Sequence, residues 1–213
     1  MSLPSRLLGA NPSIQVSALL SGSLSTPSAK QPFDAGGYES IATTVLSSGS
    51  AVVEFNSIPQ TYKHLQLRCL AQTNRPTYHI DELFMDRVNG STASTTYGHR
   101  LHGPNDTGTT VYSSSYQLSD GVFLSYISSS VASNVFGVAI VDILDYTSTS
   151  KFKTIMGFGG ADTNGTAGGY RPSVSLFSGY IPTTSAITSF RLRPSVGSQL
   201  NTYSHFALYG MKA

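Results

Sequence analysis

Alternation of apolar and polar residues recurs along the chain from residue 38 onward, which is the pattern of strands that bury one face. The clearest run covers 62–71, where Leu65, Leu67 and Cys69 occupy alternate positions between polar residues. Because neighbouring side chains of a strand point to opposite faces, these three are expected to enter a core together.

Turn-forming residues separate such runs at short, regular intervals, and no segment shows a sustained helical period. We expect a hairpin over 38–55, since only Ser-Ser-Gly-Ser separates its two runs. The predicted fold class is all-β, an antiparallel β-sandwich or jelly-roll-like domain. The expected strands are 38–46, 51–55, 62–71, 78–88, 96–101, 122–127, 135–144, 151–158, 173–180, 186–193 and 204–212.

Two stretches depart from simple alternation. Residues 135–144 are nearly all apolar, which predicts a central strand buried on both faces. Residues 159–169 are rich in glycine and are expected to form a loop between strands. This loop opens no helix, so phosphate binding there lacks its usual physical basis.

The chain divides near Gly36 and Gly37, which predicts two parts, 1–37 and 38–213. The first part is rich in Ser and Pro and holds no long hydrophobic period, so it is expected to be an extended arm. Its short apolar clusters are the expected anchor points on neighbouring subunits; the alternative is an arm folded back on its own domain. The anchor residues are Leu7, Leu8, Ile14, Val16, Leu19, Leu20 and Phe33.

Composition adds a reason to expect an assembly. Charged residues make up 11% of the chain, against about 25% in an ordinary soluble domain. A free monomer normally stays soluble through a charged surface, whereas this chain is filled with Ser and Thr. The net charge of +2 is scattered, so we expect no nucleic-acid partner, and no apolar run is long enough for membrane insertion.

Chemical motifs point away from an enzyme. The chain has no Gly-x-Ser-x-Gly elbow, no Gly-x-x-x-x-Gly-Lys loop and no Gly-x-Gly-x-x-Gly fingerprint. The lone Cys69 is expected to be a buried small apolar residue. The pair His99 and His102 lacks an obvious third zinc ligand. We therefore expect no catalytic residue, no metal and no cofactor.

One segment concentrates polar and aromatic side chains, Tyr-Gly-His-Arg-Leu-His-Gly over 97–103. Tyr, His and Arg combine flat faces with hydrogen-bond donors, which suits contact with sugars or protein surfaces. Packing between subunits is the alternative reading. The candidate surface-contact patch is Tyr97, His99, Arg100, His102, Tyr112 and Tyr116.

Three blocks of the sequence have distinctive motifs: 38–44, 53–68 and the ending 204–213. The second block contains Ser-Ile-Pro-Gln-Thr-Tyr-Lys-His-Leu-Gln. With 97–103, they resemble a family of small virion structural proteins of tailed bacteriophages, common among cyanophages and other marine phages. The resemblance implies a virion component, a homotrimer with an exposed β-sandwich and an arm docked into the particle. The shared motifs imply a scaffold, and the resemblance assigns no catalytic residue to this chain.

The expected function is that of a tail-fibre or tail-associated subunit. Its arm would attach to other virion proteins, and its β domain would contact the polysaccharide or protein of the host surface. Two alternatives stay open: a capsid decoration (cement) protein, and a free carbohydrate-binding jelly-roll protein. The expected location is the exterior of the virion, at the tail or the capsid.

Overall fold

Strands account for the regular structure of the domain that follows residue 37. The computed structural model describes residues 37–92, 96–103, 111–118, 121–131, 134–162 and 173–212. All seven predicted anchor residues, from Leu7 to Phe33, lie outside these ranges. Within them there is no helix, which confirms the prediction of an all-β domain.

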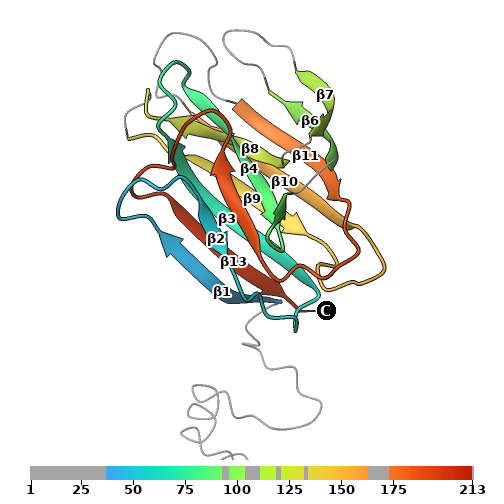
Figure 1. Cartoon of the computed structure of the whole chain (residues 1–213). Coiled ribbons are helices and arrows are strands. Elements are labelled where there is room, and N and C mark those ends of the chain that lie inside the picture. The colour runs from blue at the N-terminus through green and yellow to red at the C-terminus, as the bar shows by residue number, and fades with distance from the viewer. Residues whose placement is uncertain are drawn as a thin grey trace, which may run out of the picture. The chain divides into compact units, whose positions relative to one another are not determined.

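The described ranges contain thirteen strands, which Figure 1 colours in the order of the chain. They are β1 (Tyr38–Val45), β2 (Val53–Phe55), β3 (His64–Thr73), β4 (Ile80–Val88), β5 (Ser91–Thr92), β6 (Thr96–His102), β7 (Tyr112–Leu118), β8 (Val122–Ser129), β9 (Gly137–Ile143), β10 (Lys153–Ala161), β11 (Ser173–Ile181), β12 (Phe190–Pro194) and β13 (His205–Met211).

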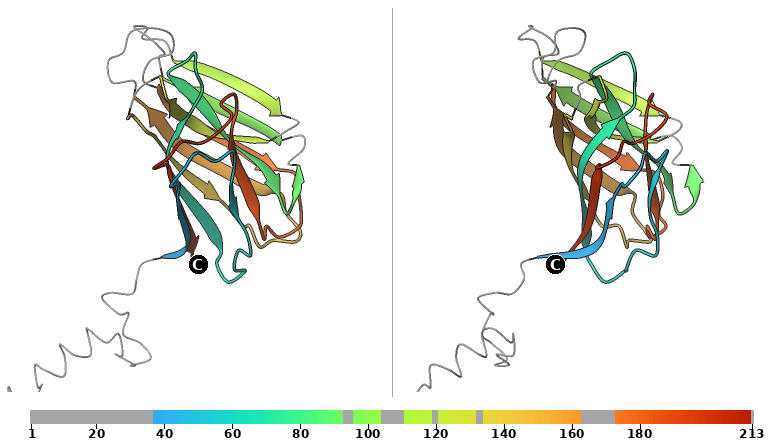
Figure 2. Two further views of the ribbon diagram at one scale, coloured as in Figure 1. Left: turned by 60° about the vertical axis from the view of Figure 1, so that its left-hand side comes forward. Right: turned by 90° about the vertical axis from the view of Figure 1, so that its left-hand side faces the viewer.

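The strands form two layers, seen edge-on in Figure 2. The larger layer has the order β1-β13-β3-β9-β10-β11-β6-β7 and is antiparallel throughout. The smaller has the order β2-β12-β4-β8, with β5 beside β4. Strand β8 packs across β9, β10 and β11. The finer expectation of a jelly-roll connectivity is not confirmed by this strand order.

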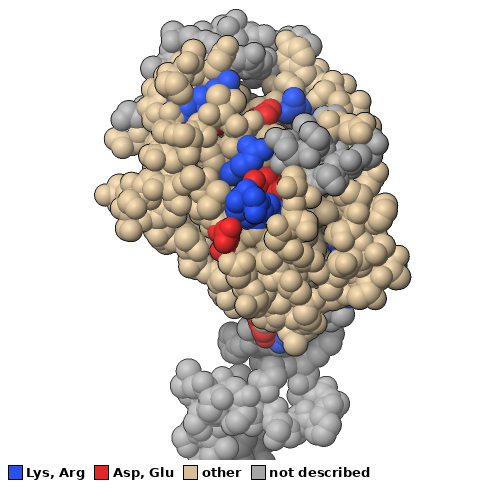
Figure 3. Space-filling view, in the orientation of Figure 1, with Lys and Arg blue, Asp and Glu red and all other residues tan. Residues whose placement is uncertain are grey.

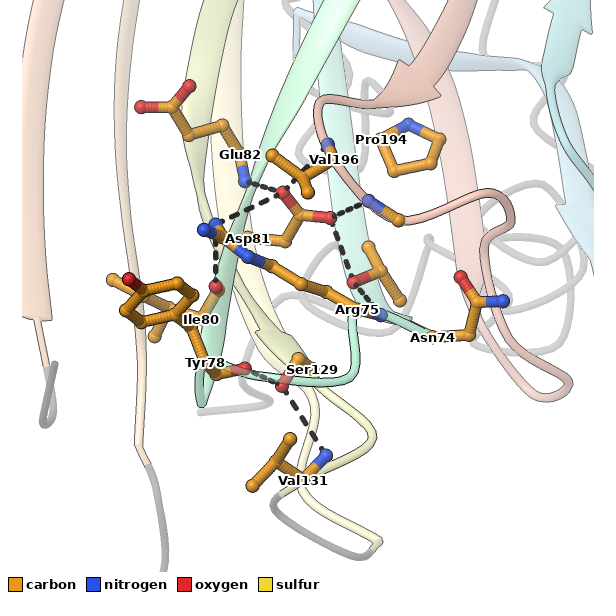
Figure 4. Close-up of polar contacts among 12 residues, drawn as sticks. Asn74, Arg75, Tyr78, Ile80, Asp81, Glu82, Ser129, Val131, Pro194 and Val196 are labelled. Carbon is orange, nitrogen blue, oxygen red and sulfur yellow. Dashed lines mark hydrogen bonds and ion pairs between the residues drawn. The ribbon is translucent and has the colours of Figure 1, made fainter. Parts of the chain in front are cut away.

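The layers join at the end of β3, which belongs to both. Gln72 and Thr73 pair in parallel with Ser128 and Ser129 of β8. Beside this junction the buried carboxylate of Asp81 accepts hydrogen bonds from several directions (Figure 4). Its donors are Thr73 Oγ1 at 3.0 Å, Glu82 N at 2.8 Å, Val196 N at 3.2 Å and Gly197 N at 2.8 Å. These bonds compensate the desolvated charge.

The predicted hairpin of the first two strands is wrong. Strand β1 pairs with β13, and β2 pairs with β12 in the other layer. The connection between β1 and β2 crosses from one layer to the other beside the segment that precedes β13. Leu46 N donates to Ser204 O, and Ser50 exchanges backbone hydrogen bonds with Leu200. A short linker therefore serves here as a crossover.

The core lies between the layers. Leu65, Leu67 and Cys69 of β3 are all buried, as the alternation predicts. From the smaller layer, the ring of Phe123 meets the ring of Phe177 edge-on, with 5.7 Å between centroids. Each such apolar side chain contributes about 1.5–3 kcal/mol through burial. Burial also raises the pKa of the Cys69 thiol, so this thiol is not an activated nucleophile.

Candidate interaction surface

The outer face of the larger layer is unusually apolar, and β9 shows it first. The prediction that this strand is buried on both faces is wrong, because its burial alternates. Val138 and Ile140 are 49% and 40% exposed, whereas Ala139 and Val141 are buried. The smaller layer covers only one face of the larger, so half of this apolar strand points outward.

The neighbouring strands carry exposed apolar side chains at the positions that pair with those of β9. Ile140 lies opposite Phe158 of β10, Phe158 opposite Leu176 of β11, and Leu176 opposite Leu101 of β6. The four side chains form one row across four strands. Apolar side chains flank this row on both sides. Together they make the apolar face, which consists of Leu70, Leu101, Val138, Ile140, Met156, Phe158, Val174 and Leu176, each 40–56% exposed.

Two hollows indent the apolar face. The larger, of about 690 Å³, has Met156, Leu176 and Leu101 among its lining, with His99 and serines of β7 around them. The smaller, of about 240 Å³, is lined in part by Ile140 and by residues of β3 and β13. Phe158 stands between them, since its partner on β9 lines one hollow and its partner on β11 lines the other.

A polar border lies where the face reaches β3. The Arg68 Nε group donates to Gln66 Oε1 at 2.8 Å, and Gln66 Nε2 donates to Asp142 Oδ1 at 2.8 Å. The Arg68 guanidinium also lies 5.1 Å from the ring centroid of Tyr209. This border therefore presents one cation and one carboxylate, both held in place by neighbours.

Charges gather on another part of the surface. Figure 3 shows acidic and basic side chains clustered near the middle of the face in view, with uncharged surface around them. On β4 and β12, Asp86 pairs with Arg191 at 2.5 Å and with Arg193 at 3.3 Å. The hydrogen bond from Arg191 to Asp86 raises the pKa of the guanidinium further. Charge that is neutralised in pairs does not mark a site for an ionic ligand.

The alternation of β6 divides the predicted surface-contact patch. His99 is exposed beside the apolar face, whereas Arg100 and His102 point to the opposite side. The backbones of Tyr97 and Tyr116 lie in β6 and β7, but their side chains fall outside the described part of the structure. The side chains of the patch that the structure describes therefore do not form one surface.

Arg100 links the two layers. Its Nη1 donates to Glu82 Oε1 at 2.8 Å, its Nε donates to Ser114 Oγ at 2.9 Å, and its guanidinium lies 5.1 Å from the ring centroid of Phe123. An arginine held this way stabilises the domain.

His102 and Tyr112 form the part of the patch that the structure brings together. Their rings stack with 5.3 Å between centroids, and Tyr112 remains exposed. Desolvation and the nearby Arg100 lower the pKa of His102. His102 thus points away from His99, so the two do not share a metal. Within the described ranges no three His, Cys, Asp or Glu side chains gather in an arrangement that could hold a metal ion.

Sequence reasoning missed the apolar face and strand β7. The signal for the face is the set of apolar residues at outward positions on adjacent strands, such as Phe158 and Leu176. It can be recognised only when the register is known, because the face forms when three consecutive strands, β9, β10 and β11, pair with one another and with the more distant β6. Strand β7 reads Tyr-Ser-Ser-Ser-Tyr-Gln-Leu, whose hydroxyls resemble a loop.

Three of the four sequence blocks behind the expected phage-family resemblance meet in space, whereas the fourth, 97–103, lies in β6 and pairs with β11 and β7. Strand β13 pairs with β1 on one side and with β3 on the other, so 38–44, the end of 53–68 and 204–212 form one three-stranded unit. The hydroxyl of Tyr62 donates to Glu39 Oε2 at 2.8 Å. A Cβ on Gly210 would lie 2.2 Å from the Tyr62 ring, so glycine is required there.

Comparison of the chain with models of protein families, with curated proteins and with solved structures finds no match. Among the described residues no helix has the length and apolar character of a membrane span.

Proposed function

We propose that this chain is a non-enzymatic structural subunit of a bacteriophage virion, a homotrimeric tail-fibre or tail-associated protein. Residues 1–37 attach it to other virion proteins, and the β domain stands on the exterior of the particle. Subunits of such assemblies act by binding neighbours, so their chemistry lies in surfaces rather than in a reactive centre.

The apolar face is the observation that carries this proposal. Eight apolar side chains, each about half exposed, form one patch on the order of several hundred Å². Monomeric proteins rarely leave a larger patch than this in water, and this chain has few charges to offset it. A permanent place among neighbouring proteins would remove the patch from solvent.

The three-stranded unit β1-β13-β3 gives second support. The residues that resemble the phage family are used in internal contacts, such as Tyr62 with Glu39 and Arg68 with Tyr209. Packing roles of this kind are what a scaffold requires.

Immunogold electron microscopy of purified particles tests the proposal, with an antibody raised against this chain. Label on the tail would support a tail-fibre or tail-associated subunit. Label on the head would favour the alternative, a capsid decoration protein. Particles without label, and without peptides of this chain in their mass spectra, would refute a virion role.

The arm is tested by two variants of the full chain. Deletion of 1–35 should abolish incorporation into particles while the β domain stays folded. A matched variant keeps the arm length but replaces Leu7, Leu8, Ile14, Val16, Leu19, Leu20 and Phe33 by Ser, and it should give the same loss. Normal incorporation of both variants would show that the arm is not the anchor.

The stacked pair of His102 and Tyr112 favours a second role, contact with host-surface glycans. An exposed aromatic ring beside an imidazole offers a flat face and hydrogen-bonding groups to a sugar. We expect Tyr112→Ala to reduce adsorption of particles to host cells, with exposed Tyr203→Ala as the control. If the isolated chain binds glycan but never enters particles, the free carbohydrate-binding alternative is favoured.

A further inference from the structure

We infer that a second copy of this chain covers the apolar face, with Phe158 of one copy seated in a hollow of the other. The inference names the partner of the same surface and rests on the proposed structural role. Three properties of the face lead to this occupant: its area, its shape and its charge.

The area matches what a stable interface needs. Side chains of these types expose on the order of 100–200 Å² when free, so eight at about half exposure leave roughly 400–800 Å². The surrounding serines and the polar border at Arg68 extend the patch. A standard interface buries about 800 Å² on each partner.

The shape supplies both halves of a contact. Phe158 is an exposed ring in the middle of the row, and a hollow lies on each side of it. The lining of the larger hollow includes the apolar side chains of Met156, Leu176 and Leu101, which suit an aromatic ring. A face that carries both a projecting ring and hollows can therefore bind another copy of itself.

The charges favour a like partner. None of the eight residues of the apolar face is ionisable, and the border near β3 holds one cation, Arg68, and one carboxylate, Asp142. Two copies therefore meet without net repulsion at this border. A strongly charged partner would lose hydration on this surface without gaining opposite charges.

The decisive experiment compares the oligomeric state of full-length variants by light scattering and sedimentation over a range of concentrations. The wild-type chain should form a closed oligomer. The double variant Phe158→Thr/Leu176→Thr should dissociate at least about 100-fold more readily. The control Val196→Thr/Tyr203→Asn changes two exposed residues outside the face and should behave like wild type, since asparagine tolerates the positive φ of residue 203.

A second test uses a thiol probe, so that its result does not depend on whether the Phe158/Leu176 double variant folds. Cys69 is buried, so Ser178→Cys on the wall of the larger hollow would supply an accessible thiol with almost no change of shape. Maleimide should label it at least about tenfold more slowly in concentrated than in dilute protein. Thr149→Cys, on an exposed turn, should be labelled equally in both.

Three results would overturn the inference. The first is a wild-type chain that stays monomeric with a labelling rate independent of concentration. The second is an oligomer that persists when both Phe158 and Leu176 are replaced. The third is a monomeric chain in which deletion of residues 1–36 speeds maleimide labelling of Ser178→Cys. That result would mean that the arm of the same copy covers the apolar face. Immunogold labelling of particles is a separate readout. A chain that is monomeric in solution but present in virions would refute only this inference. A chain that is oligomeric but absent from virions would refute only the proposed function.

Discussion

The imidazole of His102 stacks on the phenol ring of Tyr112, with 17° between the two planes. The pair joins β6 to the edge strand β7, and the ring of Tyr126 meets the imidazole edge-on from β8. A histidine in this position ties the edge of the larger layer to the smaller layer.

The stability of the domain should depend on the protonation of His102. Its pKa is lowered in the fold, so on acidification the unfolded chain binds this proton first. The contribution of neutral His102 is therefore complete above the usual histidine range and is lost as the pH falls through the lowered pKa. We expect the melting temperature to fall between pH 7.5 and 5.5, and to fall less in His102→Gln.

His99 supplies the control for that measurement, since it lies on the same strand and is exposed on the opposite side. His99→Gln should show the same pH dependence as wild type. An identical fall in both variants would assign the effect to other groups.

Lys153 should be a structural residue, although a lysine on a strand suggests a solvent-exposed position. Its side chain is fully buried, and its ammonium donates to the carbonyls of Ser148 at 2.6 Å, Lys151 at 2.8 Å and Thr183 at 3.3 Å. Lys153→Met would leave these carbonyls without their donor, so we expect a loss of about 2–4 kcal/mol in chemical unfolding. Exposed Lys151→Met should cost about 1 kcal/mol or less.

Asn89 should hold the turn between β4 and β5 against the segment that enters β12. Asn89 and Gly90 both have positive φ, 53° and 76°, as a two-residue hairpin requires. The Asn89 side chain accepts from Thr188 N at 2.8 Å and donates to Ala186 O at 2.7 Å. We expect Asn89→Ala to cost about 2–3 kcal/mol in thermal or chemical unfolding.

A substitution at Asn134 separates the backbone contribution to that loss of stability from the contribution of the side-chain hydrogen bonds. Asn134 also has a positive φ, 59°, and it is exposed. Asn134→Ala should reveal the backbone contribution, about 1 kcal/mol. Equal costs at the two positions would mean that the Asn89 side-chain bonds contribute little.

Gly159 should resist even a methyl group. A Cβ there would lie 2.1 Å from Ser125 Oγ and 2.5 Å from Val138 O. The Ser125 hydroxyl can rotate away, but the Val138 carbonyl is backbone, so Gly159→Ala must shift β9 or β10 as well as crowd β8. We expect a loss of about 2 kcal/mol or more in unfolding experiments. Gly160→Ala, whose Cβ would point to the other face by alternation, should be tolerated. A neutral Gly159→Ala would show that β8 does not pack this closely.

That glycine also shows why one prediction from the sequence is wrong. Residues 159–161 were expected to begin a loop, yet they complete β10. Glycine punctuates loops in most sequences, but here it makes room for a strand of the other layer. The need for that room arises from a neighbour more than thirty residues away in sequence.

Local alternation predicts which side chains of a strand share a face but not what covers each face. It placed Leu65 and Leu67 correctly in the core. The same alternation holds in β12, where Phe190 and Leu192 are buried and Arg191 and Arg193 are partly exposed. It misread β9, since an apolar run looks the same whether its second face meets a layer or meets water. The apolar face could not be foreseen for that reason.

The pairing of Tyr38 with Met211 places the two ends of the domain side by side. The chain therefore enters β1 and leaves β13 at the same corner of the sheet. A bulky reporter fused to the carboxyl end would crowd the point where residue 37 enters β1. Reporters are better inserted elsewhere.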